Sequence, residues 1–241
     1  PLLFLPGVSV RHAEVALRLA VPGKKKKRVV AQRGPLLVTH TGLSGPAALR
    51  LSAFAARDFH ALGYSTAVSI NWAPHAGTGE EVFEVLWRQT SRSPKRGVGT
   101  SCPLVPGEDD EGAAPIPRRL WARLVLNAGF QPDDVWGGAS KKAVRKLAHL
   151  VTGTEVEITG KGVFKEEFVT AGGIKLGEVD MKTMGSKKCE GLFCCGELLD
   201  VDGVTGGFNF MNCWSSGFVA GNSAADFVAK MCEERLIEHI D

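Results

Sequence analysis

The sequence predicts a mixed α/β fold built in two parts. Short runs of alternating apolar and polar residues near the N-terminus, beginning with residues 8–20, are typical of strands with one buried face. Two later stretches, 116–128 and 138–150, have the spacing of amphipathic helices. Toward the C-terminus, an apolar run, a glycine-rich turn and a long helix-like stretch follow one another. These observations favour an α/β fold with a boundary near residue 165.

The N-terminal strands are expected at residues 8–20, 34–39 and 65–72. Short strands with this alternation suit a small antiparallel barrel or sheet. The basic run Lys24–Arg28 follows a Pro-Gly pair and precedes an apolar stretch, which indicates a hairpin loop. We interpret this run as a solvated loop tip, with a nuclear signal or a phosphate-binding patch as the alternatives.

A helix is expected to begin in the segment Gly42–Pro46 and to run to about His60. Ser44 is a suitable N-cap, and Pro46 is tolerated in a first helical turn. A nucleophilic serine in a G-x-S-x-G elbow would need glycine at position 46, where this chain has proline. We therefore predict that Ser44 caps a helix and is not a hydrolase nucleophile.

The middle of the chain is expected to be mainly helical. Residues 79–90 are helix-like, and residues 91–114 are rich in Ser, Gly, Pro and acidic residues, which is typical of an exposed loop. The helix at 116–128 should end at Gly129, because glycine favours the left-handed conformation found there. A second helix at 138–150 and a strand at 154–164 should follow.

Residues 196–221 are the most informative segment. The apolar run 191–195 predicts a buried strand, after which come an acidic residue, a glycine-rich loop and a helix that runs from about Asn209 to Arg235. Backbone N–H groups at a helix N-terminus favour anionic or electron-rich ligand atoms, and glycines allow close approach. This pattern suits a phosphorylated, hydroxyl-bearing cofactor. An ordinary strand-turn-helix connection without a ligand is the alternative.

Four ordered motifs resemble those of the BaiN-like flavoproteins, also described as aminoacetone oxidase-type FAD-binding enzymes. The motifs are THTGLSGP at 39–46, VTAGGI at 169–174, TMGSK at 183–187, and GLFCCGELLDVDGVTGGFN at 191–209 with a Trp-Ser-Ser-Gly helix after it. The match is dense from 165 to 225, good from 34 to 53 and thin between 75 and 150. Four motifs in this order are much more specific than one glycine-rich loop.

The resemblance implies both a fold and an activity. Residues 165–241 would form the C-terminal segment of an FAD/NAD(P)-binding Rossmann-like domain. Residues 1–164 would form an inserted domain with a β-barrel-like part and a helical part at about 115–151. The protein would be part of an FAD-dependent oxidoreductase that transfers hydride on an unidentified small molecule, with NAD(P)H as the candidate electron donor. No catalytic residue is predicted, because the cofactor carries the chemistry.

The resemblance also assigns thirteen residues to the cofactor. Gly196 and Glu197 would meet the ribityl chain or ribose, and Asp200 would order the loop. The turn and helix start that approach the pyrimidine edge of the flavin are Gly206, Gly207, Phe208, Asn209 and Phe210. The other approach to the ring would be lined by Thr170, Gly172 and Gly173, with Thr183 and Met184 close by. The structural alternatives are a simple β-turn at 172–173 and a turn acceptor at Asp200.

A G-x-G-x-x-G turn, which would hold the FAD pyrophosphate, does not occur in the sequence. The nearest candidate, at 97–102, lacks the third glycine, and the chain begins at Pro1 rather than Met. We therefore interpret the chain as the C-terminal part of a longer flavoprotein or a truncated gene model. The alternative function is a non-catalytic remnant or binding protein without a complete FAD site. An RNA-associated module is disfavoured, because the basic residues do not alternate with aromatic ones.

Composition limits the partners. The net charge is +3, from 29 basic and 26 acidic residues, which is too small to argue for a nucleic-acid or membrane partner. No apolar run approaches the roughly 20 residues that span a bilayer. The six cysteines contain no C-x-x-C pair, so we interpret them as reduced thiols of an intracellular protein, cytoplasmic or organellar, with a vicinal disulfide at 194–195 as the alternative. No zinc site is predicted, because no histidine pair has the required spacing.

Overall fold

The computed structural model describes residues 5–19, 28–107, 115–162, 169–203 and 207–238. The chain divides into two compact units, Pro1–Lys165 and Glu166–Asp241. The expected assignment of these parts to an inserted domain and a flavin-binding domain stays a prediction.

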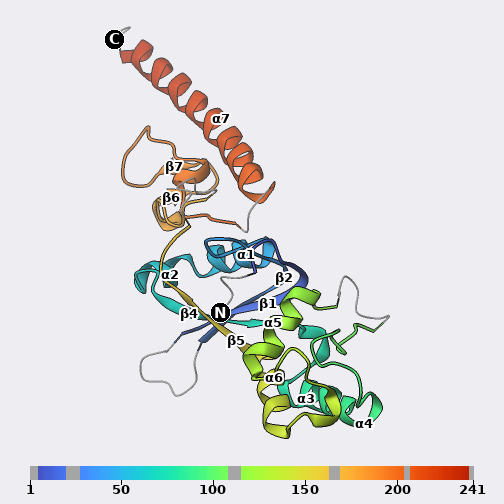
Figure 1. Cartoon of the computed structure of the whole chain (residues 1–241). Coiled ribbons are helices and arrows are strands. Elements are labelled where there is room, and N and C mark those ends of the chain that lie inside the picture. Colours follow the sequence, from blue (N-terminus) through green and yellow to red (C-terminus); the bar gives the residue numbers. More distant parts are fainter. Residues whose placement is uncertain (1–4, 20–27, 108–114, 163–168, 204–206, 239–241) are drawn as a thin grey trace. The chain divides into compact units, whose positions relative to one another are not determined.

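The first unit is built on a five-stranded antiparallel sheet with the strand order β3-β2-β1-β4-β5 (Figure 1). The strands are β1 (Ser9–Leu19), β2 (Arg28–Val38), β3 (Leu43–Ser44), β4 (Thr66–Asn71) and β5 (Thr154–Ile158). All three N-terminal strands expected from the alternation are present, and β2 begins earlier than expected. Leu19 pairs with Arg28, which confirms the hairpin. Lys24–Lys27 lie outside the described residues.

A register shift in β1 explains how its apolar residues all reach the core. Val10 and Ala13 are both buried, although an odd spacing would place their side chains on opposite faces of a regular strand. The pairing with β2 shifts between these two residues. The extra residue of the bulge restores the alternation, so that Val15 and Leu17 continue on the buried face.

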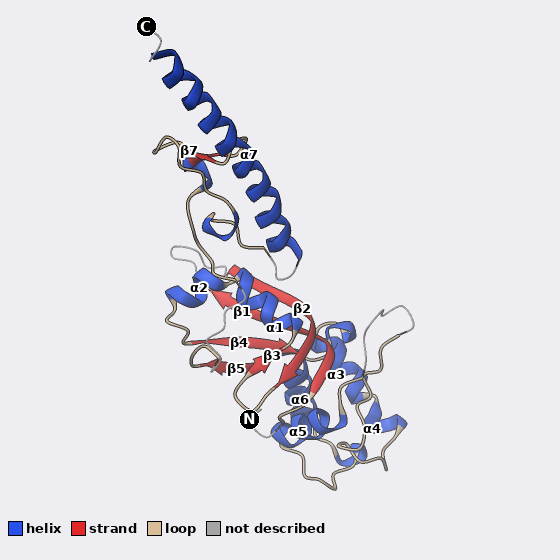
Figure 2. Ribbon diagram, turned by 90° about the horizontal axis from the view of Figure 1, so that it is seen from above, coloured by secondary structure: helices blue, strands red, loops and turns tan. Residues whose placement is uncertain are grey.

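Six α-helices complete the first unit, within the described residues. They are α1 (Pro46–Phe54), α2 (Ala56–Ala61), α3 (Gly79–Trp87), α4 (Gln89–Arg92), α5 (Arg118–Ala128) and α6 (Lys141–Gly153), with short 3-10 turns η1 (Pro74–Ala76) and η2 (Trp136–Gly138). Helix α1 packs on β1 and β2, α6 packs on β4, and α3 and α5 pack on α6 (Figure 2). Helix α5 ends at Gly129 with φ 103°, which confirms the predicted left-handed cap.

The prediction that Ser44 caps the helix is wrong. Ser44 lies in β3, where it pairs with Leu37, and Gly45 occupies the N-cap of α1 without any side-chain cap. Gly45 has φ 91°, and a Cβ atom there would lie 2.9 Å from the carbonyl oxygen of Pro35. Close approach of the two backbones therefore decides where α1 begins. The helix expected to reach His60 is broken at Ala55, between α1 and α2.

One hydrophobic core joins the sheet and the helices. Trp72, Trp121 and Trp136 are completely or almost completely buried in it. Trp72 donates its indole N–H to Thr154 Oγ1 at 2.8 Å, and Trp121 donates to the carbonyl oxygen of Val98 at 2.8 Å. Both indole N–H groups thus have hydrogen-bond acceptors, so burying these rings leaves no unsatisfied donor in the core.

The second unit has little regular structure besides one long helix, α7 (Gly207–Glu238). Its strands β6 (Val179–Asp180) and β7 (Gly185–Ser186) form a two-residue ladder, and its 3-10 turns are η3 (Leu176–Glu178) and η4 (Gly196–Leu198). Among the described residues of this unit, five form a buried cluster: Val179, Met184, Cys194, Leu199 and Ala220.

The strand expected at 191–195 is wrong. Within the described residues, only Phe193 in this stretch makes a bridge, to Gly185. Gly191 and Gly196 bracket the stretch with φ 75° and 68°, which is not extended backbone. The neighbour of this stretch is β7, but the pairing is confined to this bridge and to the hydrogen bonds from the Ser186 N–H to Leu192 and from the Cys194 N–H to Met184, so it does not extend into a longer ladder.

Candidate functional site

The turn that carries Glu197 is fastened to α7. Gly196 donates its N–H to Ser216 Oγ at 2.9 Å and accepts from Asn212 Nδ2 at 3.4 Å. Gly196 has φ 68°, and a Cβ atom there would lie 3.3 Å from the Cys213 sulfur. Residue 196 is therefore glycine for two reasons, the left-handed backbone and the close approach of the helix. Sequence reasoning missed Asn212 and Ser216, whose i, i+4 spacing on a helix was the available signal.

The predicted residues on either side of this turn lie together. The Glu197 side chain is exposed, and its Oε1 accepts a hydrogen bond from the Thr170 N–H at 3.3 Å. The N–H of Ile174 donates to Leu198 at 2.8 Å, and the N–H of Asp200 donates back to Ile174 at 2.9 Å. Segment 170–174 therefore runs alongside segment 197–200, as a bridge between Ile174 and Leu199 shows.

Gly173 is required by this contact. Its φ is 148°, and a Cβ atom would lie 2.6 Å from the carbonyl carbon of Leu199. Gly172 has φ 115° but open space around it. The two glycines therefore have different roles: Gly173 allows the two segments to meet, and Gly172 leaves room beside them.

The start of α7 presents Asn209 toward the glycine-rich loop. Asn209 Oδ1 accepts from the Gly203 N–H at 2.9 Å. Its Nδ2 is buried and has no hydrogen-bond partner among the described residues. A buried amide donor without an acceptor costs about 1–3 kcal/mol, so this group is a candidate to donate a hydrogen bond to a ligand. Gly206, which precedes the helix, lies outside the described residues.

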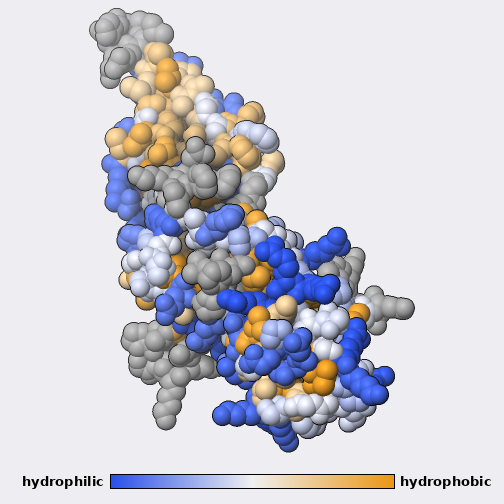
Figure 3. All heavy atoms as spheres, viewed as in Figure 1, coloured by the Kyte–Doolittle hydropathy of each residue, from blue (hydrophilic) through white to orange (hydrophobic). Residues whose placement is uncertain are grey.

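Large apolar side chains along α7 are exposed. Their exposed fractions are 58% for Phe208, 63% for Phe210, 66% for Trp214 and 74% for Phe218. Figure 3 shows apolar colouring along this helix. Within the described residues of this unit, no strand packs extensively against α7. The side chains of Phe208 and Phe210 are consequently free to contact a ligand.

Thr183 and Met184 form the β6–β7 turn. Met184 has φ 60°, its N–H donates to Asp180, and its carbonyl oxygen accepts from the Cys194 N–H at 2.9 Å. Its side chain is 6% exposed and belongs to the buried cluster. Thr183 is exposed, and its Oγ1 accepts from the Gly185 N–H at 3.2 Å. The Met184 side chain thus supports the site from the core, and Thr183 is the member of the pair that faces outward.

In the described ranges, none of the helices is both long and apolar enough to cross a bilayer. The same ranges contain no group of three or more His, Cys, Asp or Glu side chains arranged to hold a metal ion.

Comparisons with known proteins extend over most of the chain. Residues 16–223 match the model of the HI0933-like protein Rossmann domain. The ribosomal RNA dihydrouridine synthase of Haemophilus influenzae is 30% identical over 188 residues, which cover 78% of this chain and 41% of that protein. The synthase of the same name from Escherichia coli is 31% identical over 198 residues, which cover 82% of this chain and 43% of that protein.

A third relative matches a shorter part of the chain. The 3-dehydro-bile acid delta(4,6)-reductase of Clostridium scindens is 44% identical over 111 residues, 46% of this chain and 27% of that protein. The chain therefore spans less than half the length of these curated relatives. The family match includes all four motifs quoted above, and the fold is mixed α/β as expected. The chain belongs to the HI0933-like Rossmann-domain family, in agreement with its resemblance to the BaiN-like flavoproteins.

Proposed function

We propose that this chain takes part in a flavoprotein oxidoreductase and holds part of an FAD molecule with residues 170–173 and 196–210. Membership of the HI0933-like family and the reductase name of the Clostridium relative support a flavin-dependent redox function. The observation that carries the proposal is the buried Nδ2 of Asn209, which has no partner among the described residues. A flavin ring offers carbonyl oxygens that would accept this hydrogen bond.

The donor and acceptor groups around Asn209 fit the rest of the cofactor. Glu197 presents an exposed carboxylate that can accept hydrogen bonds from ribityl or ribose hydroxyls. The dipole of α7 favours negative charge near its N-terminus. Phe208 and Phe210 offer exposed aromatic surface at the same helix start.

Bound FAD would supply hydride transfer, and the residues of this chain would position it and exclude water. The Thr170 N–H orients the Glu197 carboxylate, and the two bonds from α7 to Gly196 hold the turn in place. The helix dipole stabilises negative charge that develops near Asn209. The aromatic pair at 208 and 210 lowers the local polarity, which strengthens these electrostatic effects.

The substrate we propose is a small molecule with an electron-poor double bond, and NAD(P)H is the proposed electron donor. The names of the relatives describe a dihydrouridine product in ribosomal RNA and a reductase acting on a bile acid. Both names describe addition of hydrogen to an unsaturated ring.

The decisive experiment compares FAD binding by the full-length gene product and its Asn209→Asp variant. Aspartate keeps an acceptor oxygen for the Gly203 N–H and removes the Nδ2 donor. A negative charge at a helix N-terminus also stabilises the helix, so the melting temperature should not fall. We expect FAD affinity to drop about tenfold or more without loss of stability. Unchanged affinity would refute the role of Asn209.

A second comparison tests the acidic residues of the turn. Glu197→Ala should weaken FAD binding by about ten- to a hundredfold, since a charged acceptor contributes about 1.5–3 kcal/mol. Asp200→Ala should have a smaller effect, because the backbone N–H of residue 200 is held by Ile174 whatever its side chain. Glu190→Ala, at an exposed position, is the control. Equal affinity of wild type and Glu197→Ala would show that Glu197 serves the fold alone.

A further inference from the structure

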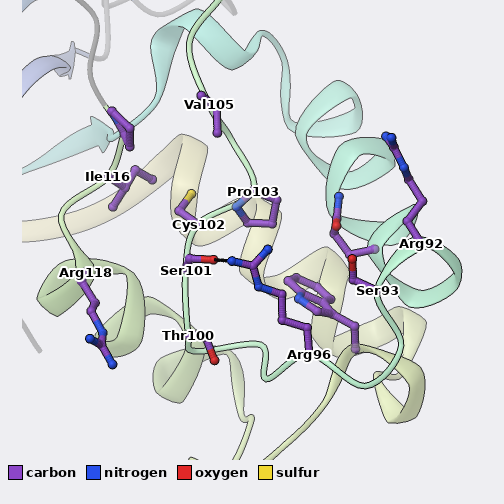
Figure 4. A pocket seen from close by; sticks show the side chains of 13 residues that line it. Arg92, Ser93, Arg96, Thr100, Ser101, Cys102, Pro103, Val105, Ile116 and Arg118 are labelled. Atoms are coloured by element: carbon purple, nitrogen blue, oxygen red, sulfur yellow. Dashed lines mark hydrogen bonds between the residues drawn. The ribbon is translucent and has the colours of Figure 1, made fainter.

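The two units offer surfaces of opposite chemistry. In the first unit, Arg92, Arg96 and Arg118 line a pocket, and Arg96 donates a hydrogen bond to Ser101 Oγ (Figure 4). In the second unit, one face of α7 carries only uncharged residues between positions 211 and 228, and most of them are apolar. A continuous uncharged face on a long helix suits packing against another helix.

The apolar face of α7 has a regular spacing. Six residues recur at alternating intervals of three and four positions, and we call them the seam: Met211, Trp214, Phe218, Gly221, Ala225 and Val228. This spacing places side chains on one face of a helix, as at the a and d positions of helices that pack together. The four larger side chains of the seam are more than half exposed, and its glycine and alanine are exposed as well.

The rest of the second unit packs on the other side of α7. Ser216 bonds to Gly196, and Ala220 belongs to the buried cluster. The ring of Phe227 packs edge-on against Phe193, with 6.1 Å between the ring centroids. These helix positions fall between the members of the seam. In the described part of the chain, the seam is therefore the side of α7 that stays open after the second unit has packed.

The sizes of the seam residues make this face complementary to itself. Its large aromatic residues, Trp214 and Phe218, come before its small ones, Gly221 and Ala225. When a second α7 lies antiparallel, with a two-fold axis between residues 219 and 220, Phe218 faces Gly221 of the other copy and Trp214 faces Ala225. Each layer then pairs a large residue with a small one, so the two helices can approach closely.

A parallel arrangement fits less well. It would put Trp214 against Trp214 and Gly221 against Gly221, which combines a steric clash with a cavity. The antiparallel pair also sets Met211 opposite Val228, so all six seam positions find a partner within the seam. The positions beside the seam at 215, 217, 222, 224 and 229 are serine, glycine, asparagine and alanine, so none of them brings a charge into the contact.

The aromatic residues supply a large part of the area that a stable dimer needs. Trp214 is 66% and Phe218 is 74% exposed, and an aromatic side chain presents about 150–250 Å², so two copies would bury roughly 400–700 Å² through these rings alone. That is about a third to somewhat more than half of the roughly 1,200 Å² at the lower end of specific interfaces. Both rings lie close to the two-fold axis, where the residues that contribute most to binding are usually found.

We propose that two copies of this chain form a two-fold symmetric dimer, in which their α7 helices pack antiparallel through the seam. The seam contains none of the residues assigned to the flavin site, so the proposal goes beyond the flavin function. Its test uses no flavin, and failure of either proposal leaves the other standing.

Sedimentation velocity of the full chain between about 1 and about 100 µM measures the dimer. The test variant is Gly221→Glu, which sets a carboxylate opposite Phe218 of the other copy and should raise the dissociation constant at least about tenfold. Glutamate favours a helix more than glycine does, so a weaker helix would not explain the loss. The matched control is Lys230→Glu, which is exposed, lies outside the seam and changes the charge more; its dissociation constant should stay within about twofold of wild type.

Cysteine cross-linking tests the direction of the helices. The double variant Met211→Cys, Val228→Cys, oxidised with copper–phenanthroline, should form covalent dimers in which peptide mass spectrometry finds residue 211 linked to residue 228. Met211→Cys alone should give no link between the two copies of residue 211, because the antiparallel pair holds them apart. Such a link would overturn the antiparallel arrangement.

The same measurements can reject the dimer itself. A wild-type chain that stays monomeric at about 100 µM would overturn the proposal and would leave the seam to another occupant, such as further chain of a longer flavoprotein. Equal losses in Gly221→Glu and Lys230→Glu, or no loss in either, would also overturn it, because the dimer would then use a different surface. Circular dichroism of both variants checks that they fold.

Discussion

Trp72, Trp121 and Trp136 of the first unit are at most 1% exposed, whereas Trp214 of the second unit is 66% exposed. The same residue type therefore has opposite surroundings in the two units. Among the described residues, a sheet and six helices enclose one core in the first unit, while a single long helix has little to pack against in the second. Burying one large apolar side chain contributes about 1.5–3 kcal/mol, and much of that stabilisation is not realised within the second unit. An apolar surface of this kind marks a place that another surface or a ligand covers.

The largest difference is expected when the two units are expressed as separate fragments and their unfolding in urea is compared. Residues 1–165 should unfold cooperatively in urea, because they contain a complete core. Residues 166–241 should show no cooperative transition and should bind the apolar dye ANS, because their five-residue cluster cannot offset the entropy of ordering the chain. Both fragments would be followed by circular dichroism. A sharp urea transition in residues 166–241 would remove the contrast between the units.

Cysteine alkylation should also distinguish the units. Cys102 in the first unit is partly buried, and its pKa is raised to about 12, whereas Cys189 in the second is exposed. Iodoacetamide at pH 8 should modify Cys189 at least about a hundredfold faster, because the thiolate is the reactive form. Peptide mass spectrometry gives both rates, and urea should bring Cys102 up to the rate of Cys189.

The same thiol makes the first unit sensitive to alkaline pH. A folded pKa above the unfolded one means that the unfolded chain releases this proton first as pH rises. The Cys102 contribution to stability is therefore full below the ordinary thiol pKa and is lost as pH rises toward about 12. An alkylation rate for Cys102 that already rises near pH 9 in the folded protein would contradict this account.

A core substitution should destabilise the first unit by an intermediate amount. Leu147 on α6 is fully buried, and Leu147→Ala should lower the free energy of unfolding by about 2–5 kcal/mol, through lost burial and the cavity left behind. Leu126→Ala on α5, where the leucine is 42% exposed, is the control and should cost less than about 1 kcal/mol. Urea titration measures both. Similar losses at the two positions would show that the core is loosely packed.

The smallest effect is expected at the basic run. Replacing Lys24–Arg28 with Gly and Ser should change the free energy of unfolding by no more than about 0.5 kcal/mol. Arg28 pairs with Asp58 on α2, but such exposed pairs contribute about 0–1 kcal/mol. A second variant, in which Lys24–Lys27 are replaced and Arg28 is kept, separates the effect of the lysines from that of the Arg28–Asp58 ion pair. A loss well above 1 kcal/mol in that variant would show that the basic run has a structural role.

The parts of the fold that depend on local sequence could be predicted. Alternation located β1 and β4, and Gly129 marked the end of α5, because these features depend on the residues themselves. The N-cap of α1 could not be predicted, because Gly45 is required by the backbone of β2. The run 191–195 has strand composition, but it pairs with β7 only at one bridge, and composition does not reveal how far a pairing extends.

In the candidate site, too, the features that depend on local sequence could be predicted, and those that depend on packing could not. The glycine-rich turn and Glu197 were visible as motifs, and the resemblance supplied Thr170 as their companion. The bonds of Asn212 and Ser216 to Gly196 were not visible, because they depend on how α7 packs.

The attachment of Gly196 to α7 has a mechanical consequence. Asn212 and Ser216, one helical turn apart, hold the carbonyl and the N–H of the same residue, so the Glu197 turn moves with the helix as one body. Helix α7 has 32 residues and a length of about 48 Å. The Glu197 carboxylate is attached near one end of this rigid helix, so a rotation of the helix would displace the carboxylate. A force on the far end, around Met231, is therefore converted into a displacement of that carboxylate.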